Sequence, residues 1–498
     1  MSVIDGAQLR APHSAAFEVV IVGSGPAGAT VARALARAGL TVAVVEEGRA
    51  LNPADAPRDG FTAMADLYRG LGATLTSGPA PMPFVQGRAV GGTSVVNGAI
   101  CWRLPRDVHE EWLRADPALA SALPWESLER EFDILERDLA IAPTPDGTAG
   151  RKNLLMARGA EALGLEHRAI SRNTRHCRGL GRCLQGCPEG NKLSMDRTFL
   201  PEAVSLGLSL FSSVRVRRLL FKSGRCIGVA ARAASGVAVQ LQASRAVVLA
   251  ASAVQSPLLL RQSGIRRPAL GHHFMGHPGV SLTGRFREPV RNWEGATQGH
   301  EVIGLRREGI KFEVLGYDLA ILASRRKGVG RALSRDINEL AHWLDWGAAI
   351  KADAKGRVSR GLLGTRVQYA LTGADMQKVR KGVAVMGCMM LAAGAESVSP
   401  GVAGWDEQVT DPARMAAFEH SGPLDPRAYA MAVTHMFGTC RMGSDPATSV
   451  VGPDFRVHGQ RGLYVADSSI FPTNTGVNPQ TSIMALAALC AHRIAHDT

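Results

Sequence analysis

FEVVIVGSGPAGATVARALARAGLTVAVVE, residues 17–46, is the stretch that decides the fold. Its first apolar run predicts a short buried strand. A tight turn follows, in which Gly23, Gly25 and Gly28 have G-x-G-x-x-G spacing. Pro26 suits the first turn of a helix, because its missing N–H would have no partner there. Apolar residues then recur at helical spacing and a second strand follows, so the stretch predicts a β-α-β unit.

The β-α-β unit has the features of a dinucleotide site. Gly23 permits the turn, Gly25 lets the backbone approach a pyrophosphate, and Gly28 lets the helix pack on the strand. Free N–H groups at the helix start hold phosphate charge. Glu46 ends the second strand, where an acid accepts hydrogen bonds from ribose hydroxyls. An ordinary glycine-rich turn is the alternative. Ser24, Pro26 and Ala27 complete the candidate phosphate loop.

Length and composition restrict the class of protein. A chain of 498 residues predicts two or three domains, and 46% hydrophobic with 20% charged residues is typical of a soluble globular protein. No run of about 18 apolar residues exists, so we expect no membrane span. Residues 1–16 lack a secretory signal pattern. The expected location is cytoplasmic, with periplasmic export on a partner's signal left open.

The charge balance is basic, with 57 Lys and Arg against 44 Asp and Glu, a net charge of +13. The basic residues are spread out and form no stripe interleaved with aromatic residues, which argues against a nucleic-acid partner. A basic surface could steer an acidic redox protein or an anionic substrate. An arginine-rich composition bias explains the same balance.

Periodicity gives a coarse map of the rest of the chain. Residues 208–248 alternate apolar and polar residues in short runs, which predicts a strand, a β-meander and a return strand. Residues 280–380 predict a separate, largely antiparallel sheet. Apolar residues at helical spacing predict helices over residues 125–141, 337–350, 376–391 and 481–496.

Five separated motifs together carry a family resemblance. They are the residue 23–28 fingerprint with Glu46, the small-residue loop 87–98, the strand-to-helix segment 250–265, the segment 435–443 (HMFGTCRMG), and the terminal pair GLYVAD and NPQT at 462–467 and 478–481. In this order they resemble the glucose–methanol–choline (GMC) oxidoreductases, flavoproteins that oxidise alcohols. Ser252 and Thr93 depart from the family pattern, but both residues are small.

The resemblance implies FAD as cofactor and an α/β fold, with a Rossmann-like FAD-binding domain interleaved with a smaller substrate domain on an antiparallel sheet. It places residues 15–110, 200–280 and 435–498 in the FAD domain, 111–199 in a helical and cysteine-rich insertion, and 281–434 in the substrate domain. Beyond the phosphate loop, the residues that it puts beside FAD are Val90, Thr93, Asn97, Gly98, Val216, Asp467, Asn478 and Pro479.

Alcohol oxidation needs a base for the hydroxyl proton while hydride moves to flavin N5, and histidine is the natural base. The resemblance puts His435 in that position and Asn478 beside it as the partner that orients the alcohol. His277, expected in a turn over residues 274–278, and His458 are expected to be structural. An oxidase that uses O2, and a lyase in which FAD is structural, remain alternatives, as does the identity of the alcohol.

Three cysteines lie close together in the sequence, at Cys177, Cys183 and Cys187, the last followed by a proline. Intervening glycines permit the chain to wrap a small centre, and Cys-Pro is common at iron–sulfur ligands. The spacing resembles a branch of GMC dehydrogenases with a [3Fe–4S] cluster, which implies electron delivery to a cytochrome, a quinone or a similar acceptor. Zinc, or cysteines without any metal, are the alternatives.

Overall fold

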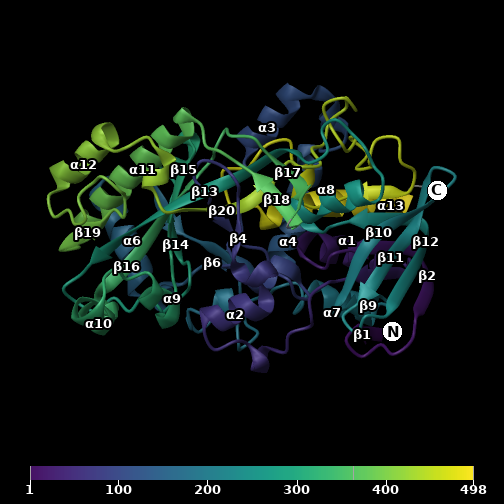
Figure 1. The fold of residues 1–498 in the computed structure, drawn as a ribbon, viewed down its shortest axis with the longest axis horizontal. Coiled ribbons are helices and arrows are strands. Elements are labelled where there is room, and N and C mark those ends of the chain that lie inside the picture. Colours follow the sequence, from purple (N-terminus) through teal and green to yellow (C-terminus); the bar gives the residue numbers. More distant parts are fainter. Residues whose placement is uncertain (1, 363, 497–498) are drawn as a thin grey trace.

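The computed structural model describes residues 2–362 and 364–496 and contains two large sheets (Figure 1). The first sheet holds the opening motif. β2 (His13–Val22), α1 (Pro26–Arg37) and β3 (Val42–Val45) form the predicted β-α-β unit, with the two strands parallel. The buried strand Val19–Val22 and the buried face of α1 supply the first core. The fold prediction for this stretch is confirmed.

The first sheet has eight strands, in the order β1-β9-β3-β2-β12-β11-β10, with β21 beside β12. The predicted β-meander is confirmed, because β10 and β11 pair antiparallel and β12 returns parallel to β2. The remaining strands of this sheet are β1 (Ser2–Asp5), β9 (Ser209–Ser212), β10 (Val214–Lys222), β11 (Arg225–Ala233), β12 (Ala238–Leu249) and β21 (Leu463–Val465).

The helices on this sheet come from distant parts of the chain. α13 (Gln480–His496), the predicted terminal helix, packs along α1 and against α4 (Trp125–Asp138). Figure 1 shows yellow α13 beside purple α1. α7 (Phe199–Ser205) contacts α1 on its other side. Residues from both ends of the chain therefore share one core.

The second sheet has eleven strands, all paired antiparallel except β5 with β20, so the antiparallel prediction is confirmed. α11 (Gly373–Ala392) packs on β13 and β16, with α6 (Arg151–Ala162) and α12 (Pro412–Ser421) against α11. The strands are β4 (Thr74–Leu75), β5 (Pro83–Phe84), β7 (His167–Ala169), β13 (His272–Arg285), β14 (His300–Val302), β15 (Ile310–Val314), β16 (Trp343–Ile350), β17 (Gly356–Gly361), β18 (Gly364–Gln368), β19 (Ser397–Ser399) and β20 (Met431–Phe437).

Two local predictions are wrong. The helix expected over residues 337–350 is the end of α10 (Gly330–Asn338) followed by strand β16, because Trp343, Leu344 and Trp346 are buried between β13 and β15. Tertiary packing overrides a helical pattern there. The turn expected over residues 274–278 is part of strand β13.

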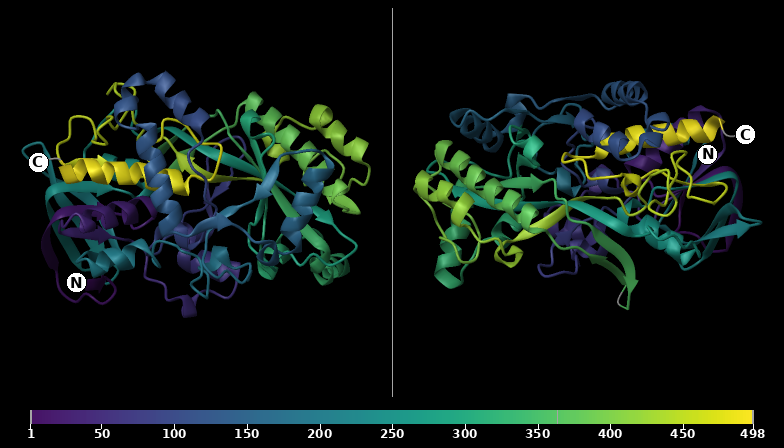
Figure 2. Two further views of the ribbon diagram at one scale, coloured as in Figure 1. Left: turned by 180° about the vertical axis from the view of Figure 1, so that it is seen from behind. Right: turned by 90° about the horizontal axis from the view of Figure 1, so that it is seen from above.

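β13 and β20 position the site, because they bring the second sheet against the first. Both strands cross the domain boundaries expected at residues 280 and 434, and they pair with each other. Figure 2 shows the sheets side by side, with α8 (Ser252–Gln262) and α13 near the junction. Among residues 2–362 and 364–496, no helix is long and apolar enough to span a membrane.

Candidate functional site

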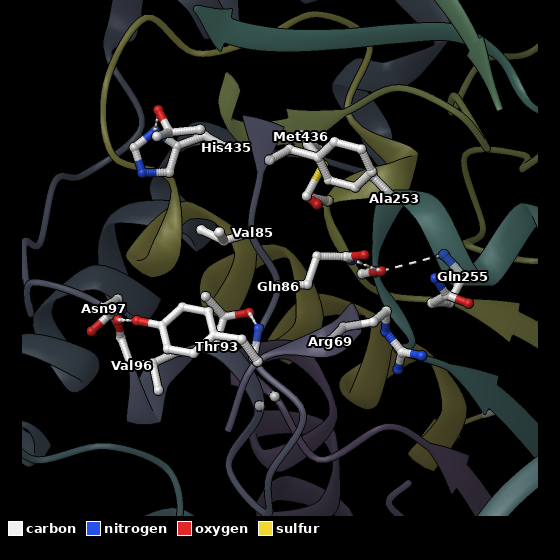
Figure 3. A pocket seen from close by; sticks show the side chains of 18 of the residues that line it. Arg69, Val85, Gln86, Thr93, Val96, Asn97, Ala253, Gln255, His435 and Met436 are labelled. Carbon is white, nitrogen blue, oxygen red and sulfur yellow. Dashed lines mark hydrogen bonds between the residues drawn. The ribbon is translucent and has the colours of Figure 1, made fainter. Parts of the chain in front are cut away.

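One cavity of about 1590 Å3 extends from the carboxyl ends of β2 and β3 to the second sheet. Its walls include the phosphate loop, the loop at residues 92–98, strands β13 and β20, and residues 478–480. Figure 3 shows His435 and Met436 on one side of this cavity and Thr93, Val96 and Asn97 on the other. Residues hundreds of positions apart therefore meet around one volume.

The glycines of the phosphate loop have different roles. Gly25 is the N-cap of α1 and provides no side-chain cap, so the first N–H groups of the helix are free to bind an anion. A Cβ on Gly25 would meet no atom of this chain nearer than the Cα of Gly92, at 3.9 Å. A Cβ on Gly28 would lie 1.9 Å from the carbonyl oxygen of Gly23. Gly25 thus faces open space that fits a pyrophosphate, whereas Gly28 is needed for packing.

Ser24 joins the phosphate loop to the second glycine-rich loop. Its hydroxyl donates to Glu46 Oε2 at 2.7 Å and accepts from the N–H of Gly91 at 2.9 Å. Glu46 also accepts from the backbone N–H groups of Ser24 and Gly48. Burial raises the pKa of Glu46, although these hydrogen bonds oppose the shift. The acid expected at the ribose is therefore fixed in position by the chain itself.

Most of the residues expected beside FAD line the cavity. These are Gly23, Ser24, Gly25, Pro26, Ala27, Glu46, Thr93, Asn97, Gly98, Val216, Asp467, Asn478 and Pro479. Val90 does not: it is buried in the core of the first sheet, and its N–H donates to the carbonyl of Arg49. Asp467 accepts from the backbone N–H groups of Ser252 and Ser469, so it ties the start of α8 to the cavity wall.

His435 lies on β20 with a φ of +51°, a left-handed conformation that is uncommon for a residue with a Cβ. Its Nδ1 is 3.1 Å from Nδ1 of His277, which is buried on the neighbouring strand β13. The N–H of Gly476 donates to Nε2 of His277 at 3.0 Å. Neutral His277 therefore carries its proton on Nδ1 and donates it to His435.

Both histidines are held neutral. Burial lowers the pKa of His435 to about 4, assisted by the charge of Lys311 and opposed by Glu313. Burial and the neighbouring His435 hold the pKa of His277 well below its usual range. The pair is therefore uncharged near pH 7, as a general base must be before it takes up a proton.

Asn478 is oriented by a buried ion cluster that the sequence reasoning missed. Lys311 on β15 donates from Nζ to Asn478 Oδ1 at 2.8 Å, and it also pairs with Glu313 and with Glu301. The amide oxygen of Asn478 is thereby engaged, and its amide nitrogen also hydrogen-bonds to the Glu313 carboxylate, so one of its two N–H groups remains for a further acceptor. Burial lowers the pKa of Lys311, but Glu301 and Glu313 outweigh that effect and raise it. Glu313 lines the cavity and accepts from Gln298 at 2.7 Å.

The sequence carried a signal for this cluster. In IKFEV, residues 310–314, two charged residues alternate with three apolar residues. Alternation normally predicts a strand with one face in water. Here all five residues are buried, so the charged face lies against the cavity wall instead of solvent.

The cysteine stretch lies against buried cations. Arg172 donates to Cys177 Sγ at 3.7 Å and to Cys183 Sγ at 3.1 Å. Lys192 donates to the carbonyls of Val95, Asn97 and Cys183. All three cysteines of the stretch are free thiols. In the part of the chain that the structure describes, no three His, Cys, Asp or Glu side chains are arranged to hold a metal ion, so the arrangement does not fit the expected cluster.

Comparison with protein families identifies two matching models described as GMC oxidoreductase, over residues 64–279 and 352–487. A model of pyridine nucleotide-disulphide oxidoreductases matches residues 17–99. A GMC-type oxidoreductase of Mycobacterium tuberculosis strain H37Rv is 35% identical over 96% of this chain and 76% of its own length. The long-chain-alcohol oxidase FAO1 of Arabidopsis thaliana is 26% identical over 96% of this chain and 66% of its own length.

Solved structures agree on the fold. Pyridoxine 4-oxidase from Mesorbium loti matches with a TM-score of 0.74 at 19% identity, over 97% of this chain and all of that one. A formate oxidase variant of Aspergillus oryzae matches with a TM-score of 0.72 at 18% identity, over 97% of this chain and 98% of that one. The mixed α/β fold with a Rossmann-like FAD-binding domain is thereby confirmed.

Proposed function

Since this chain belongs to the GMC oxidoreductase family, we propose that it oxidises an alcohol to an aldehyde or ketone, with His435 as the base and Asn478 as the orienting donor. The observation that carries the proposal is that one cavity contains both side chains and also the open phosphate loop at Gly25. FAD, when bound, supplies the acceptor for the hydride of the alcohol carbon. The glycine-rich loop, Glu46 and Asn97 would hold it.

In this proposal, different residues orient the alcohol and remove its proton. Asn478 offers its amide nitrogen to the alcohol oxygen, while Lys311 keeps the amide from rotating. His435 is neutral and removes the hydroxyl proton. Its Nδ1 is engaged by His277, which leaves Nε2 as the nitrogen for the substrate. While His277 donates its proton to Nδ1 of His435, however, the proton of neutral His435 lies on its own Nε2.

Nε2 of His435 can act as the base only when His277 becomes the acceptor of this hydrogen bond. That change requires the hydrogen bond from the N–H of Gly476 to His277 to open.

The substrate and the final electron acceptor are further parts of the proposal. The names of the similar proteins, a long-chain-alcohol oxidase and a pyridoxine 4-oxidase, support testing both apolar and aromatic alcohols. The test is anaerobic titration of the purified flavoprotein with such a panel. Loss of the oxidised flavin absorbance with one of the alcohols supports the proposal. If no alcohol reduces the flavin while the protein cleaves a substrate, the enzyme is a lyase and the proposal fails.

Reoxidation then separates an oxidase from a dehydrogenase. O2 that restores the flavin as fast as an artificial acceptor indicates an oxidase. Slow reaction with O2 indicates delivery to a cytochrome, a quinone or a similar acceptor. The iron–sulfur route that the cysteine spacing suggests is not part of the proposal, because the described thiols are not arranged to hold a metal ion. Iron analysis after anaerobic purification tests this, and about three iron atoms per chain would contradict it.

A further inference from the structure

A β-hairpin built from β17 and β18 projects from the second sheet. In the right-hand view of Figure 2 it extends beyond the rest of the molecule as a green finger. The two strands pair up to Gly361 and Gly364, so the turn lies at the outer end. Leu362 in this turn has a relative exposure of 107%, the highest value of any large hydrophobic residue described. Leu362 therefore presents its apolar side chain to water, without cover from any other residue that the structure describes.

The hairpin is positively charged throughout. Arg357, Arg360 and Arg366 lie on its strands, and residues 354–374 contain no Asp or Glu. Among the described residues, no carboxylate forms an ion pair with any of these three arginines. Arg261 of α8 lies beside the hairpin, where burial and the charge of Arg357 lower its pKa. This surface is therefore short of negative charge.

The same hairpin borders the active-site cavity. Arg360, Gly364 and Thr365 line the cavity. The N–H of Ser77 donates to the carbonyl of Val367 at 2.7 Å, which fixes the hairpin beside β4. Leu75 on β4 is itself 59% exposed. The hairpin thus combines an apolar tip, arginines without a described carboxylate partner, and part of the cavity wall.

We propose that this hairpin docks the protein on an anionic lipid bilayer, with Leu362 inserted among the lipids and the arginines against the headgroups. A protruding apolar tip with basic flanks is the arrangement by which peripheral proteins bind the membrane interface. An acidic protein surface would satisfy the arginines but leave Leu362 at a polar interface, whereas a bilayer accommodates both features. The occupant that fits is therefore lipid.

Docking in this orientation would hold one wall of the cavity near the membrane. If the enzyme oxidises alcohols as proposed above, an apolar alcohol dissolved in the bilayer is the substrate class that gains from this position. That consequence rests on the proposed function. The docking itself does not, because binding to vesicles is measured without turnover.

The test is flotation of the purified flavoprotein with vesicles. The wild-type protein should float with phosphatidylcholine–phosphatidylglycerol vesicles and far less with phosphatidylcholine alone. Leu362→Asp should reduce binding about tenfold or more, because a charge opposes insertion. Arg357→Gln and Arg366→Gln should each reduce it about fivefold. Leu424→Asp changes an exposed leucine outside the hairpin and should bind as the wild type does.

Two results overturn the proposal. One is equal flotation of the wild-type protein and Leu362→Asp, which would reduce the interaction to non-specific charge attraction. The other is no flotation of the wild type together with salt-sensitive binding to an acidic protein, which would assign the arginines to a protein partner. Retained flavin absorbance and circular dichroism show that each variant is folded.

Discussion

His277 and His435 lie on adjacent strands with their Nδ1 atoms 3.1 Å apart, and the backbone N–H of Gly476 fixes which of the two rings donates. The hydrogen bond from Gly476 makes His277 the donor and His435 the acceptor. His277, which the sequence pattern assigned to a structural turn, is therefore the hydrogen-bond donor to the expected base.

Replacement of His435 by alanine should lower kcat by about 10²- to 10⁴-fold, the range that general-base catalysis contributes. FAD content should remain normal, because the phosphate loop is held by its own contacts, from Ser24 to Glu46 and Gly91, which do not involve His435. Stopped-flow flavin reduction with saturating alcohol measures the effect. A loss of less than tenfold would show that another group takes the proton.

Replacement of His277 by phenylalanine should act on protonation more than on rate. Both tautomers of His435 become available, and its pKa should rise somewhat because the hydrogen bond that His277 donates to its neutral form is lost, while burial, the main cause of the low pKa, remains. We expect kcat to change by less than about tenfold and the acid limb of kcat/KM to move to higher pH. A pH profile checks this. A loss equal to that of His435→Ala would make His277 itself the proton acceptor.

Stability should fall as the solution is acidified from about pH 6.5 toward 4. The folded pKa of His435 is about 4, below its unfolded value near 6.5, so the unfolded chain binds more protons in this window. The contribution is complete above pH 6.5 and decreases by up to about 1.4 kcal/mol per pH unit below it. Glu46 and Asp467 have raised pKa values and act in the opposite direction. The measurement is therefore the free energy of unfolding in urea as a function of pH, for the wild type and for His435→Asn. The free energy of the variant should depend less steeply on pH than that of the wild type.

Replacement of Lys311 by methionine should destabilise the fold by about 3–5 kcal/mol, because buried Glu313 loses its cation and buried Glu301 keeps only Arg168. Turnover should also fall, since Asn478 loses the donor that orients it. Lys351→Met is the matched control: it breaks a partly exposed pair with Glu111 and should cost less than about 1 kcal/mol. Urea unfolding compares the two. Equal effects would show that the buried cluster is not a stabilising element.

Replacement of Gly25 by alanine should reduce FAD retention while the apoprotein stays folded. The added methyl group meets no atom of this chain within 3.9 Å, but it points into the space expected for the pyrophosphate. Gly28→Ala should instead destabilise the fold, because its methyl group would overlap the carbonyl of Gly23. Gly147→Ala, at an exposed position with nothing nearby, is the control. Flavin absorbance per chain and thermal unfolding measure both properties.

The sequence was sufficient for the β-α-β unit and the β-meander, because strand periodicity and glycine spacing are local properties. The meeting of the distant motifs was implied by the family resemblance and not by any local pattern. It failed at residues 343–350, where burial between two strands decided the structure. It failed also at residues 274–278, because pairing of β13 with the distant strand β20 replaces the expected turn. Lys311 and Glu313 alternate with apolar residues in the sequence, which predicts a strand. Which face of this strand meets the cavity, however, depends on how the sheets pack.

The cysteine stretch shows a different limit of prediction from the sequence. Spacing and glycines suggested a metal centre, yet the described thiols face Arg172 and do not converge as ligands. The positive φ of Cys187 was consistent with the expected wrapping, but conformation alone does not determine what a loop surrounds.

The hydroxyl of Ser24 links the two glycine-rich loops through Glu46 and Gly91, with contacts that lie entirely within the chain. The cradle is therefore preorganised, and little chain entropy is lost when a nucleotide enters it. We expect such a cradle to accept a modified flavin without refolding of the chain. Reconstitution with flavin analogues of graded reduction potential would then vary the driving force of the reaction while every side chain of the site stays the same.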